Sequence, residues 1–320
     1  MRLEAMILCA GLGTRLRPLT FERAKPAVPL LNRPLVGYSL ALLRAQGLTH
    51  ATINTHWLPE SMREIAEAEA TRLGMDLRVS HEPQILGTGG GLRQARDLGL
   101  IARDATLLIL NGDVLFDVDL DRVVQAHQET HALATMVLRP MPQGATYSPV
   151  EADESGRIWR IGRFGEPGHG AASLFSGIHV LSAEALDLLP AGESGVIETV
   201  YAPLLARGAR VQAVFEPGLW LDLGDPTGYL DAHLTLLDGQ SSLGALERHG
   251  ILSRSVSGIS PQAHIAASAR VTRSSIGAGA MIGDGAVVTD SVVWEGADIG
   301  AKEEIVRTVV TPKVRVPVPL

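Results

Sequence analysis

The segment Ala5-Met6-Ile7-Leu8-Cys9-Ala10-Gly11-Leu12-Gly13-Thr14-Arg15 decides the fold of this chain. Its first half, residues 5–9, is an unbroken apolar run of the length of a buried strand. Its second half is rich in glycine, which lets backbone N–H groups approach a phosphate closely because no Cβ stands in the way. The segment therefore predicts a first strand that runs into a phosphate-binding loop.

Cationic side chains accompany this loop. Arg15, Arg17 and Lys25 supply the fixed positive charge that a triphosphate needs. The chain has 28 lysines and arginines, but its only lysines are Lys25, Lys302 and Lys313. An ammonium is a compact point charge on a flexible stem, so a single lysine in a region that otherwise uses arginine indicates that the position needs an ammonium. We expect Lys25 to contact phosphate.

Composition narrows the class of protein. A chain of 320 residues that is 46% hydrophobic is long enough for two domains with a large core. A net charge of −7 argues against a general nucleic-acid or membrane surface. The single cysteine, Cys9, cannot form an internal disulfide. No signal peptide and no membrane-spanning run is recognisable, so we expect a soluble cytoplasmic protein with neither nucleic acid nor membrane as a partner.

Apolar runs alternate with helical patterns up to about residue 235. Strands are expected over 5–9, 51–54, 76–80 and 106–110, and helices over 34–46, 59–72 and 89–98. This alternation predicts an α/β fold with a doubly wound, Rossmann-like mixed sheet. Ligands of such sheets bind at the carboxyl ends of the strands. The glycine-rich loop and Asn111-Gly112-Asp113 both fall there.

The C-terminal part has a different pattern. Aliphatic residues recur six apart in three triplets, which are Ile259, Ile265 and Val271, then Ile276, Ile282 and Val288, then Val293, Ile299 and Ile305. The first members of the triplets are equally spaced along the chain, and Val310 continues their series. Small residues between them complete the pattern of a hexapeptide β-helix, with one triplet in each three-sided coil. We therefore predict a first domain over 1–237, a linker over 238–252 and a short β-helix over 253–320.

Two aspartates each follow an apolar run, Asp113 in Leu108-Ile109-Leu110-Asn111-Gly112-Asp113 and Asp222 in Leu219-Trp220-Leu221-Asp222. Two carboxylates that converge on a phosphate site can hold Mg²⁺, which prefers hard oxygen ligands. In a nucleotide-transfer reaction this ion neutralises charge and orients the α-phosphate. We therefore predict Mg²⁺ as the cofactor, with Asp113 and Asp222 as its ligands.

A second glycine-rich segment, Glu82-Pro83-Gln84-Ile85-Leu86-Gly87-Thr88-Gly89-Gly90-Gly91, opens a helix. Its backbone could lie flat against a nucleobase while Glu82 reads the base edge. A carboxylate only accepts hydrogen bonds, so guanine would satisfy both of its oxygens and uracil one. Adenine offers no ring N–H on that edge. ATP is therefore the least expected nucleotide, and GTP and UTP both stay open.

The part of the chain up to residue 235 resembles the sugar-1-phosphate nucleotidylyltransferases, also called NDP-sugar pyrophosphorylases. The matching motifs, in the order of the family, are Gly11-Leu12-Gly13-Thr14-Arg15-Leu16 with Lys25-Pro26, Leu86-Gly87-Thr88-Gly89-Gly90, Asn111-Gly112-Asp113 and Trp220-Leu221-Asp222-Leu223-Gly224. The resemblance extends to the C-terminal left-handed β-helix that many members carry. Within the family the chain is most similar to mannose-1-phosphate guanylyltransferases and N-acetylmuramate-1-phosphate uridylyltransferases.

The resemblance implies a reaction in which an NTP and a sugar 1-phosphate give an NDP-sugar and pyrophosphate. It favours GTP with mannose 1-phosphate. The alternative is UTP with the 1-phosphate of glucose, N-acetylglucosamine or N-acetylmuramic acid. The sugar phosphate attacks the α-phosphate as an anion, so the reaction needs positioning and electrostatics rather than a general base.

The resemblance also implies a role for each matched residue. Arg15, Lys25 and Asp113 would be catalytic, and Asp113 and Asp222 would hold the metal. The residues that would contact the nucleotide are Ala10, Gly11, Gly13, Thr14, Glu82, Gly87 and Thr88. Those that would line the sugar pocket are Asn111, Gly112, Gly177, Glu198 and Thr199.

The sugar half departs from the family pattern. Many members have Glu-Lys-Pro, whose lysine grips the sugar phosphate, whereas this chain has Gly165-Glu166-Pro167. Arg160 and Arg163 are the candidate replacements. The usual Tyr-Gly is Tyr147-Ser148 here. The identity of the sugar is therefore the least transferable property.

Three other classes of protein are disfavoured. A regulatory subunit without activity would be expected to have lost one of Arg15, Lys25, Asp113 and Asp222, and all four are present. A P-loop kinase or phosphatase would need the Gly-Lys-Ser/Thr ending, which the loop lacks. Acetyl transfer at His264 has no further motif to support it.

We expect the β-helix to serve assembly, because its open end and the valine-rich tail over 306–318 would expose apolar edges. We therefore predict a homo-oligomer, a dimer rather than a trimer.

Overall fold

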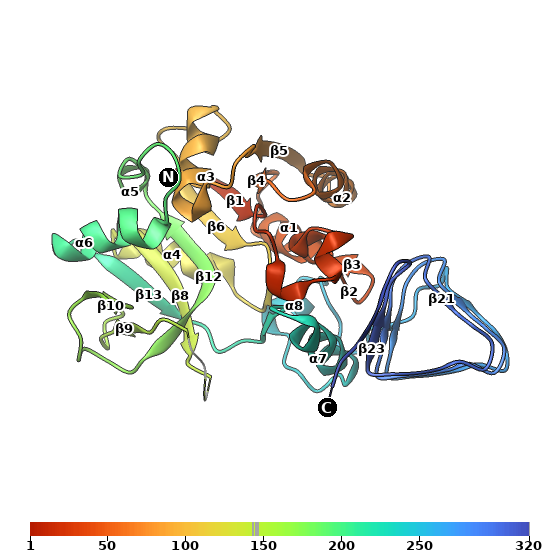
Figure 1. Cartoon of the computed structure of the whole chain (residues 1–320). Coiled ribbons are helices and arrows are strands. Elements are labelled where there is room, and N and C mark those ends of the chain that lie inside the picture. Colours follow the sequence, from red (N-terminus) through yellow and green to blue (C-terminus); the bar gives the residue numbers. More distant parts are fainter. Residues whose placement is uncertain (143, 145–146, 320) are drawn as a thin grey trace. The chain divides into compact units, whose positions relative to one another are not determined.

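The computed structural model describes residues 1–142, 144 and 147–319 (Figure 1). The chain forms two compact units, each built from separate stretches of sequence. The first, here called the sheet unit, contains Met1–Gly11, Ser39–Gly112 and Val118–Gly218. The second, here called the coil unit, contains Leu12–Tyr38, Asp113–Asp117 and Leu219–Leu320. The domain boundaries expected from the sequence, 1–237 and 253–320 with a linker between them, stay a prediction.

A mixed sheet forms the centre of the sheet unit. Its strands run in the order β11-β10-β9-β12-β6-β1-β4-β5, and β8 pairs with both β12 and β13. Their bounds are β1 (Leu3–Leu8), β4 (His50–Thr55), β5 (Asp76–His81), β6 (Thr106–Asn111), β8 (Ala134–Pro140), β9 (Val150–Ala152), β10 (Ile158–Ile161), β11 (Phe164–Gly165), β12 (Ser173–Leu181) and β13 (Val211–Phe215). Strands β6, β1, β4 and β5 are parallel, and β12 is antiparallel to β6. The predicted doubly wound α/β fold is confirmed.

Helices connect these strands. They are α1 (Leu35–Ala45), α2 (Pro59–Arg72), α3 (Gly87–Asp97), α4 (Leu120–Glu129), α5 (Ala183–Leu186), the π-helix η4 (Ile197–Tyr201) and α6 (Ala202–Ala206). Met6, Leu92 and Ile109 lie at the centre of one apolar core and are fully buried. Strands β1 and β6 lie inside the sheet and nearly all of their side chains are buried, as expected of parallel strands whose two faces are both covered. The strands and helices expected up to residue 110 are confirmed, with small differences at their ends.

Parallel strands in the coil unit stack with a constant offset, so that each coil repeats the one before it. They are β15 (His264–Ile265), β16 (Arg270–Thr272), β17 (Ser275–Ile276), β18 (Met281–Ile282), β19 (Val287–Thr289), β20 (Val292–Val293), β21 (Asp298–Ile299), β22 (Glu304–Val306) and β23 (Thr308–Val310). Ile265 pairs with Ile282, Val271 with Val288 and Ile276 with Val293. From Ile265 to Val310 the predicted aliphatic positions therefore form three columns that face the core, and the parallel β-helix is confirmed (blue in Figure 1). Ile259 of the first predicted triplet is an exception, because it bridges to Ile276 but is 38% exposed.

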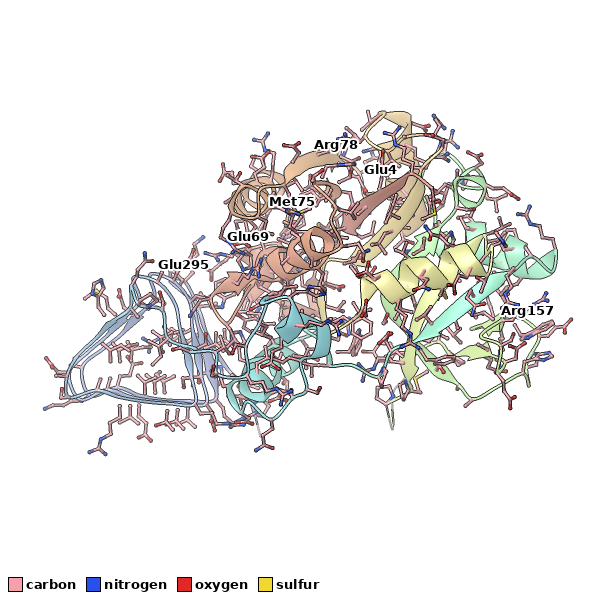
Figure 2. The ribbon with its side chains drawn as sticks, turned by 180° about the vertical axis from the view of Figure 1, so that it is seen from behind. Glu4, Glu69, Met75, Arg78, Arg157 and Glu295 are labelled. Atoms are coloured by element: carbon pink, nitrogen blue, oxygen red, sulfur yellow. The ribbon has the colours of Figure 1, made fainter. Side chains whose placement is uncertain are left out.

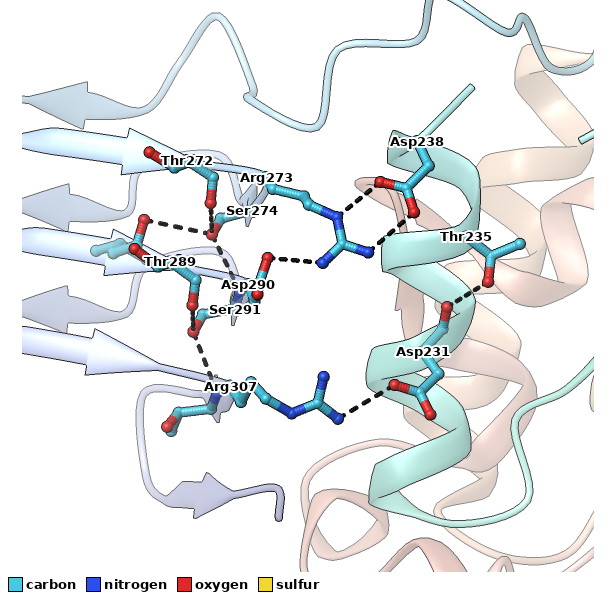
Figure 3. A network of polar contacts seen from close by, with 12 residues as sticks. Asp231, Thr235, Asp238, Thr272, Arg273, Ser274, Thr289, Asp290, Ser291 and Arg307 are labelled. Atoms are coloured by element: carbon cyan, nitrogen blue, oxygen red, sulfur yellow. Dashed lines mark hydrogen bonds and ion pairs between the residues drawn. The ribbon is translucent and has the colours of Figure 1, made fainter. Parts of the chain in front are cut away.

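Arginines at one corner of the β-helix bind helix α7 (Pro226–Leu237) (Figure 3). Arg273, Asp290 and Arg307 occupy equivalent positions in successive coils and share a left-handed backbone, with φ of 48°, 48° and 44°. The guanidinium of Arg273 pairs with Asp238 at 2.6 Å and with Asp290 at 2.9 Å. Arg307 pairs with Asp231 at 3.3 Å. The repeat thus places equivalent side chains of successive coils against one helix.

One element was not expected. Residues 238–252 were predicted to be a connector, but α8 (Gly244–Arg248) lies within them. Leu243 and Leu246 are buried there, and the Asp117 carboxylate accepts a hydrogen bond from the Leu246 N–H at 3.0 Å. Burial raises the pKa of Asp117. A helix this short has no periodicity to detect, and a distant carboxylate stabilises this one.

The remaining short elements belong to the coil unit. They are η1 (Thr14–Leu16), η2 (Leu19–Phe21), η3 (Lys25–Ala27), β2 (Pro29–Leu30), β3 (Arg33–Pro34), β7 (Val114–Phe116), β14 (Trp220–Asp222) and β24 (Arg315–Pro317). Strand β24 folds back antiparallel onto β23, with Val316 opposite Val309. Among the described residues, none of the helices has the length and apolar composition that a membrane span requires.

Candidate active site

A small β-ribbon brings the two predicted metal ligands together. Strands β7 and β14 pair antiparallel, with Val114 opposite Asp222. Asp113 directly precedes β7, so its side chain starts at the same end of the ribbon as Asp222. The two aspartates are far apart in the sequence, but the pairing of β7 with β14 brings them close together in space.

Lys25 lies between these two carboxylates. Its Nζ is 2.9 Å from Asp113 Oδ2 and 3.3 Å from Asp222 Oδ1. Lys25 is only 5% exposed, whereas the Asp113 side chain is 40% exposed. A buried ammonium requires paired negative charge, and both carboxylates supply it. Lys25 is therefore bound by two carboxylates, and solvent can reach this cluster through the partly exposed Asp113.

The loop after β1 contributes to the same cluster. Gly13 has a φ of +60°, and a Cβ there would lie 2.9 Å from Thr20 Cγ2 and 3.2 Å from Lys25 Cβ, so only glycine fits. Thr14 and Arg15 follow it, and Arg15 is exposed. A Cβ at Gly224 would lie 3.2 Å from Arg15 Nη1 and 3.3 Å from Asp222 Oδ2, which places this guanidinium beside the Asp222 carboxylate. Two cations and two carboxylates thus share one cluster.

The donor set of this cluster suits a divalent cation. Over the described ranges, no group of three or more His, Cys, Asp and Glu side chains forms a complete protein cage for a metal. The two carboxylate oxygens at Asp113 and Asp222 already face one positive charge, the Lys25 ammonium. Mg²⁺ characteristically takes one or two carboxylates and completes its shell with phosphate oxygens and water. The residues present therefore fit Mg²⁺ bound together with a phosphate substrate.

Glu82 has a different environment from the one expected. It is fully buried in the sheet unit. Its Oε1 accepts a hydrogen bond from Asn54 Nδ2 at 2.7 Å, and its Oε2 accepts one from the Leu86 N–H at 2.9 Å. Both oxygens that were expected to read a guanine therefore already have partners inside the protein. This geometry does not support base recognition by Glu82, which was the argument for expecting GTP or UTP rather than ATP.

Asn54 links Glu82 to the start of the phosphate loop. Its Oδ1 accepts a hydrogen bond from the Cys9 N–H at 2.7 Å. Gly91 is needed beside this pair, because a Cβ there would lie 2.6 Å from Glu82 Oε1. Glu82 thus orders the end of β1, after which Ala10 is buried and Gly11 is exposed with open space around it. Asn54 was not predicted as a site residue, although its place near the carboxyl end of β4 was a usable signal.

The second glycine-rich segment packs against the loop of residues 192–196 and does not present an open surface. The helix α3 begins at Gly87, and the Gly89 N–H donates to the Ser194 carbonyl at 2.8 Å. A Cβ at Gly90 would lie 2.3 Å from the Gly192 carbonyl oxygen. Thr88 Oγ1 accepts a hydrogen bond from the Val196 N–H at 2.9 Å. These glycines therefore permit close packing of residues 192–196.

Two of the predicted nucleotide residues and two of the predicted sugar residues contact the loop of residues 192–196. Gly87 and Thr88 contact it from the start of α3. From η4, Thr199 Oγ1 donates to the Gly195 carbonyl at 2.7 Å, and a Cβ at Gly195 would lie 2.2 Å from Glu198 Oε2. The structure thus brings four residues of two predicted subsites together around one loop.

The other predicted sugar residues lie at the carboxyl end of β6. Gly177 has a φ of +91°, and a Cβ there would lie 2.8 Å from Asn111 Nδ2. The Gly112 N–H donates to the Leu8 carbonyl at 3.0 Å. Asn111, Gly112 and Gly177 are therefore neighbours, next to the end of β1.

The two candidates for the missing lysine differ in their partners. Arg160 forms an ion pair with Glu151 at 2.8 Å and donates to the Gly162 carbonyl at 2.7 Å. The Arg163 guanidinium lies 4.9 Å from the centre of the Phe164 ring. Arg163 is therefore the more available of the two for a phosphate.

Comparison with known proteins identifies two family matches. The family described as Nucleotidyl transferase matches residues 4–239, and the family described as GlmU-like, C-terminal hexapeptide, matches residues 245–319. Mannose-1-phosphate guanyltransferase beta-B of Xenopus laevis is 30% identical over 71% of this chain and 63% of its own length. UTP--glucose-1-phosphate uridylyltransferase of Synechocystis sp. is 31% identical over 72% of this chain and 62% of its own.

A third relative is similar to the same extent. Probable mannose-1-phosphate guanylyltransferase 2 of Arabidopsis thaliana is 29% identical over 74% of this chain and 65% of its own length. The chain thus spans less than two thirds of the length of each of these three relatives.

Proposed function

Because this chain belongs to the nucleotidyl transferase family, we propose that it transfers a nucleotidyl group from an NTP to a sugar 1-phosphate and releases pyrophosphate. The observation that carries the proposal is the position of Lys25 within 3.3 Å of both Asp113 and Asp222, with Arg15 beside Asp222. Two cations and a pair of carboxylates suited to Mg²⁺ are what a triphosphate requires at the point where it is cleaved.

Each residue of the cluster has a task in this proposal. Asp113 and Asp222 hold Mg²⁺, which when bound neutralises negative charge on the phosphates. Lys25 and Arg15 stabilise the charge that develops on the α-phosphate and on the leaving pyrophosphate. The sugar 1-phosphate is already an anion, so the protein supplies alignment rather than a base.

We propose GTP and mannose 1-phosphate as the first substrate pair to test, on the resemblance to guanylyltransferases. UTP with glucose 1-phosphate is the alternative, which the Synechocystis relative favours by its name. We assign the phosphate of the sugar to Arg163, because Arg160 is already paired with Glu151. The test is pyrophosphate release, with Mg²⁺, from four NTPs combined with the 1-phosphates of mannose, glucose, N-acetylglucosamine and N-acetylmuramic acid. No release from any combination would contradict the proposal.

Glu82→Gln is expected to lower stability without changing the choice of nucleotide. Both oxygens of Glu82 accept hydrogen bonds, from the Leu86 N–H and from Asn54 Nδ2, so whichever way the new amide turns its N–H₂ faces a donor. Loss of such a buried hydrogen bond lowers the free energy of unfolding by about 1–3 kcal/mol. Chemical denaturation measures this change, and the ratio of kcat/KM for GTP and UTP is expected to stay within about twofold.

Glu4→Gln is the matched control (Figure 2 labels Glu4). Glu4 is also a buried glutamate of the sheet unit, and it accepts a hydrogen bond from the Ala102 N–H at 3.1 Å. Both variants should lose stability and keep the nucleotide ratio. If the ratio of kcat/KM for GTP and UTP changes in Glu82→Gln but not in Glu4→Gln, Glu82 does take part in base recognition.

The oligomer also remains a proposal. Strand β24 pairs with β23, and the Val318 N–H donates to the Arg307 carbonyl at 2.7 Å, so part of the expected free edge is satisfied within the chain. Met281 and Val306 remain exposed, at 55% and 50%. We expect a homodimer that buries such side chains. Sedimentation velocity at micromolar concentration tests this, and a monomer throughout the range would contradict it.

A further inference from the structure

We propose that the β-helix positions Lys25, by holding at both ends the stretch of residues 22–32 that carries it, here called the Lys25 segment. Trp294, Tyr229 and Thr311 are the positioning residues. That Lys25 acts in nucleotidyl transfer rests on the proposed function, whereas the positioning itself is a property of the coil unit alone. The β-helix would then serve the active site as well as assembly.

The first anchor lies immediately before Lys25. Thr311 Oγ1, at the end of the last coil, donates a hydrogen bond to the Glu22 carboxylate. The Arg23 guanidinium pairs with Glu295, which Figure 2 labels, and lies over the Trp294 ring, 5.2 Å from its centre. Two consecutive residues of the Lys25 segment are thus bound by successive coils of the β-helix.

The second anchor lies shortly after Lys25. The Pro29 carbonyl accepts hydrogen bonds from the Tyr229 hydroxyl and, at 3.2 Å, from His233 Nε2. The Tyr229 oxygen in turn accepts a hydrogen bond from Trp294 Nε1 at 3.0 Å. Trp294 therefore takes part in both anchors, through its ring at Arg23 and through its N–H at Tyr229.

The second anchor is buried and its donors are fixed. Tyr229 and His233 are fully buried, and Trp294 is 2% exposed. Burial raises the pKa of Tyr229 and lowers the pKa of His233 to about 3, so both side chains are neutral near pH 7. Because a carbonyl only accepts, Nε2 of His233 must carry its proton. The two hydrogen bonds to Pro29 therefore persist across the working range of pH.

A cavity lies beside this anchor, so the hydrogen bonds of the Lys25 segment replace close packing there. It has a volume of about 160 Å³ and is lined by Pro29, Asn32, His233, Val293 and Trp294 among others. On this side the Lys25 segment is not backed by continuous packing. Asn32 Nδ2 donates to the Gly258 carbonyl at 2.9 Å at the far end of the segment. On the side of the cavity the segment is therefore held by directed hydrogen bonds, whereas elsewhere residues such as Val28 and Leu30 are fully buried.

The consequence for chemistry follows from the short distances at Lys25. Its ammonium is held within 3.3 Å of both carboxylates by a backbone that the two anchors restrain. A displacement of about 1 Å in a catalytic group can cost on the order of a hundredfold in rate. Loosening an anchor should therefore lower kcat, although no anchor residue touches the phosphates in this proposal.

Competitive labelling of lysine amines tests the positioning without any substrate. The chain has three lysines, and Lys302 and Lys313 are exposed while Lys25 is buried, so the exposed pair serves as an internal reference. Trace acetylation with acetic anhydride, followed by peptide mass spectrometry, gives the labelling ratio, which is the extent of acetylation of Lys25 divided by that of the reference lysines. We expect Trp294→Phe, which keeps a ring but removes the N–H, to raise this ratio about fivefold through local opening. Trp294→Leu should raise it further.

Thr311 gives an independent pair of variants. Thr311→Val removes the hydroxyl that binds Glu22 and should raise the labelling ratio, whereas Thr311→Ser keeps the hydroxyl and should restore it. Lys302 is the reference here, because the Lys313 N–H bonds to Thr311. Glu303→Gln is the matched control, since it disrupts the Arg315–Glu303 pair of the β-helix, and with Lys313 as reference it should leave Lys25 unchanged.

Kinetics separates the inference from the proposed function. With the best substrate pair, Trp294→Phe should lower kcat about tenfold and leave the KM for the sugar 1-phosphate within about twofold. If labelling and kcat of Trp294→Phe and Thr311→Val equal those of the wild type and of Glu303→Gln, the inference is overturned. A fall in Tm without a change in the labelling ratio also overturns it. If the ratio rises but the wild type turns over no substrate, the positioning stands and the proposed function fails.

Discussion

Lys25→Met is expected to lower kcat by about 10²- to 10³-fold, because in the proposed function the variant would lose a preorganised charge at the phosphate undergoing transfer. Methionine keeps the unbranched stem, so the packing around this 5%-exposed side chain is retained. The variant should also bind Mn²⁺ more tightly in the absence of nucleotide, since the ammonium no longer competes for the oxygens of Asp113 and Asp222. Pyrophosphate release measures kcat, and the electron paramagnetic resonance of free Mn²⁺ measures binding.

Lys302→Met is the control for this result. Lys302 is exposed and lies on the β-helix, so its removal deletes the same charge without reaching the carboxylates. Its kcat and its Mn²⁺ affinity should equal those of the wild type. Lys25→Met with a kcat within threefold of the wild type would exclude Lys25 from the reaction.

Asp222→Asn is expected to lower kcat about a thousandfold, because in the proposed function Mg²⁺ would lose one of its two anionic ligands and the phosphates would lose charge neutralisation. Asparagine has the same shape, and Lys25 keeps its partner Asp113 at 2.9 Å, so the fold is retained. The loss should be partly reversed by raising the Mg²⁺ concentration. Initial rates across a series of Mg²⁺ concentrations measure both effects, and Asp113→Asn should behave in the same way.

Asp231→Asn is the matched control in the same unit. Asp231 is an exposed aspartate whose partner is Arg307, so its substitution removes a surface ion pair of small energetic value. Its rates and Mg²⁺ dependence should follow those of the wild type. Full Mg²⁺-dependent turnover in both Asp113→Asn and Asp222→Asn would refute the assignment of the metal ligands.

Much of the fold was predictable because it depends on local patterns. The α2 helix begins at Pro59 and ends at Arg72 as predicted, since proline suits a first helical turn and the pattern is periodic throughout. The β-helix was predictable because each aliphatic side chain pairs with its equivalent in the next coil. The helix α8 was not, because this short element depends on the distant Asp117.

The site was partly predictable for the same reason. Asp113 and Asp222 could be expected at strand ends, where ligands of such sheets bind, and the structure brings both to Lys25. The environment of Glu82 could not be predicted, because its partner Asn54 is distant in the sequence and nothing local indicates the hydrogen bond. The same holds for Trp294 and Tyr229, which are still further apart along the chain.

The most direct test follows a labelled phosphorus atom. The protein is incubated with Mg²⁺, a sugar 1-phosphate and GTP or UTP that carries ³²P at the α position or, in a parallel reaction, at the γ position. The account predicts that α label appears in the sugar nucleotide while γ label leaves as pyrophosphate, and that Asp222→Asn nearly abolishes both. Transfer of γ label to the sugar phosphate, or release of γ label as orthophosphate, would contradict nucleotidyl transfer at this site.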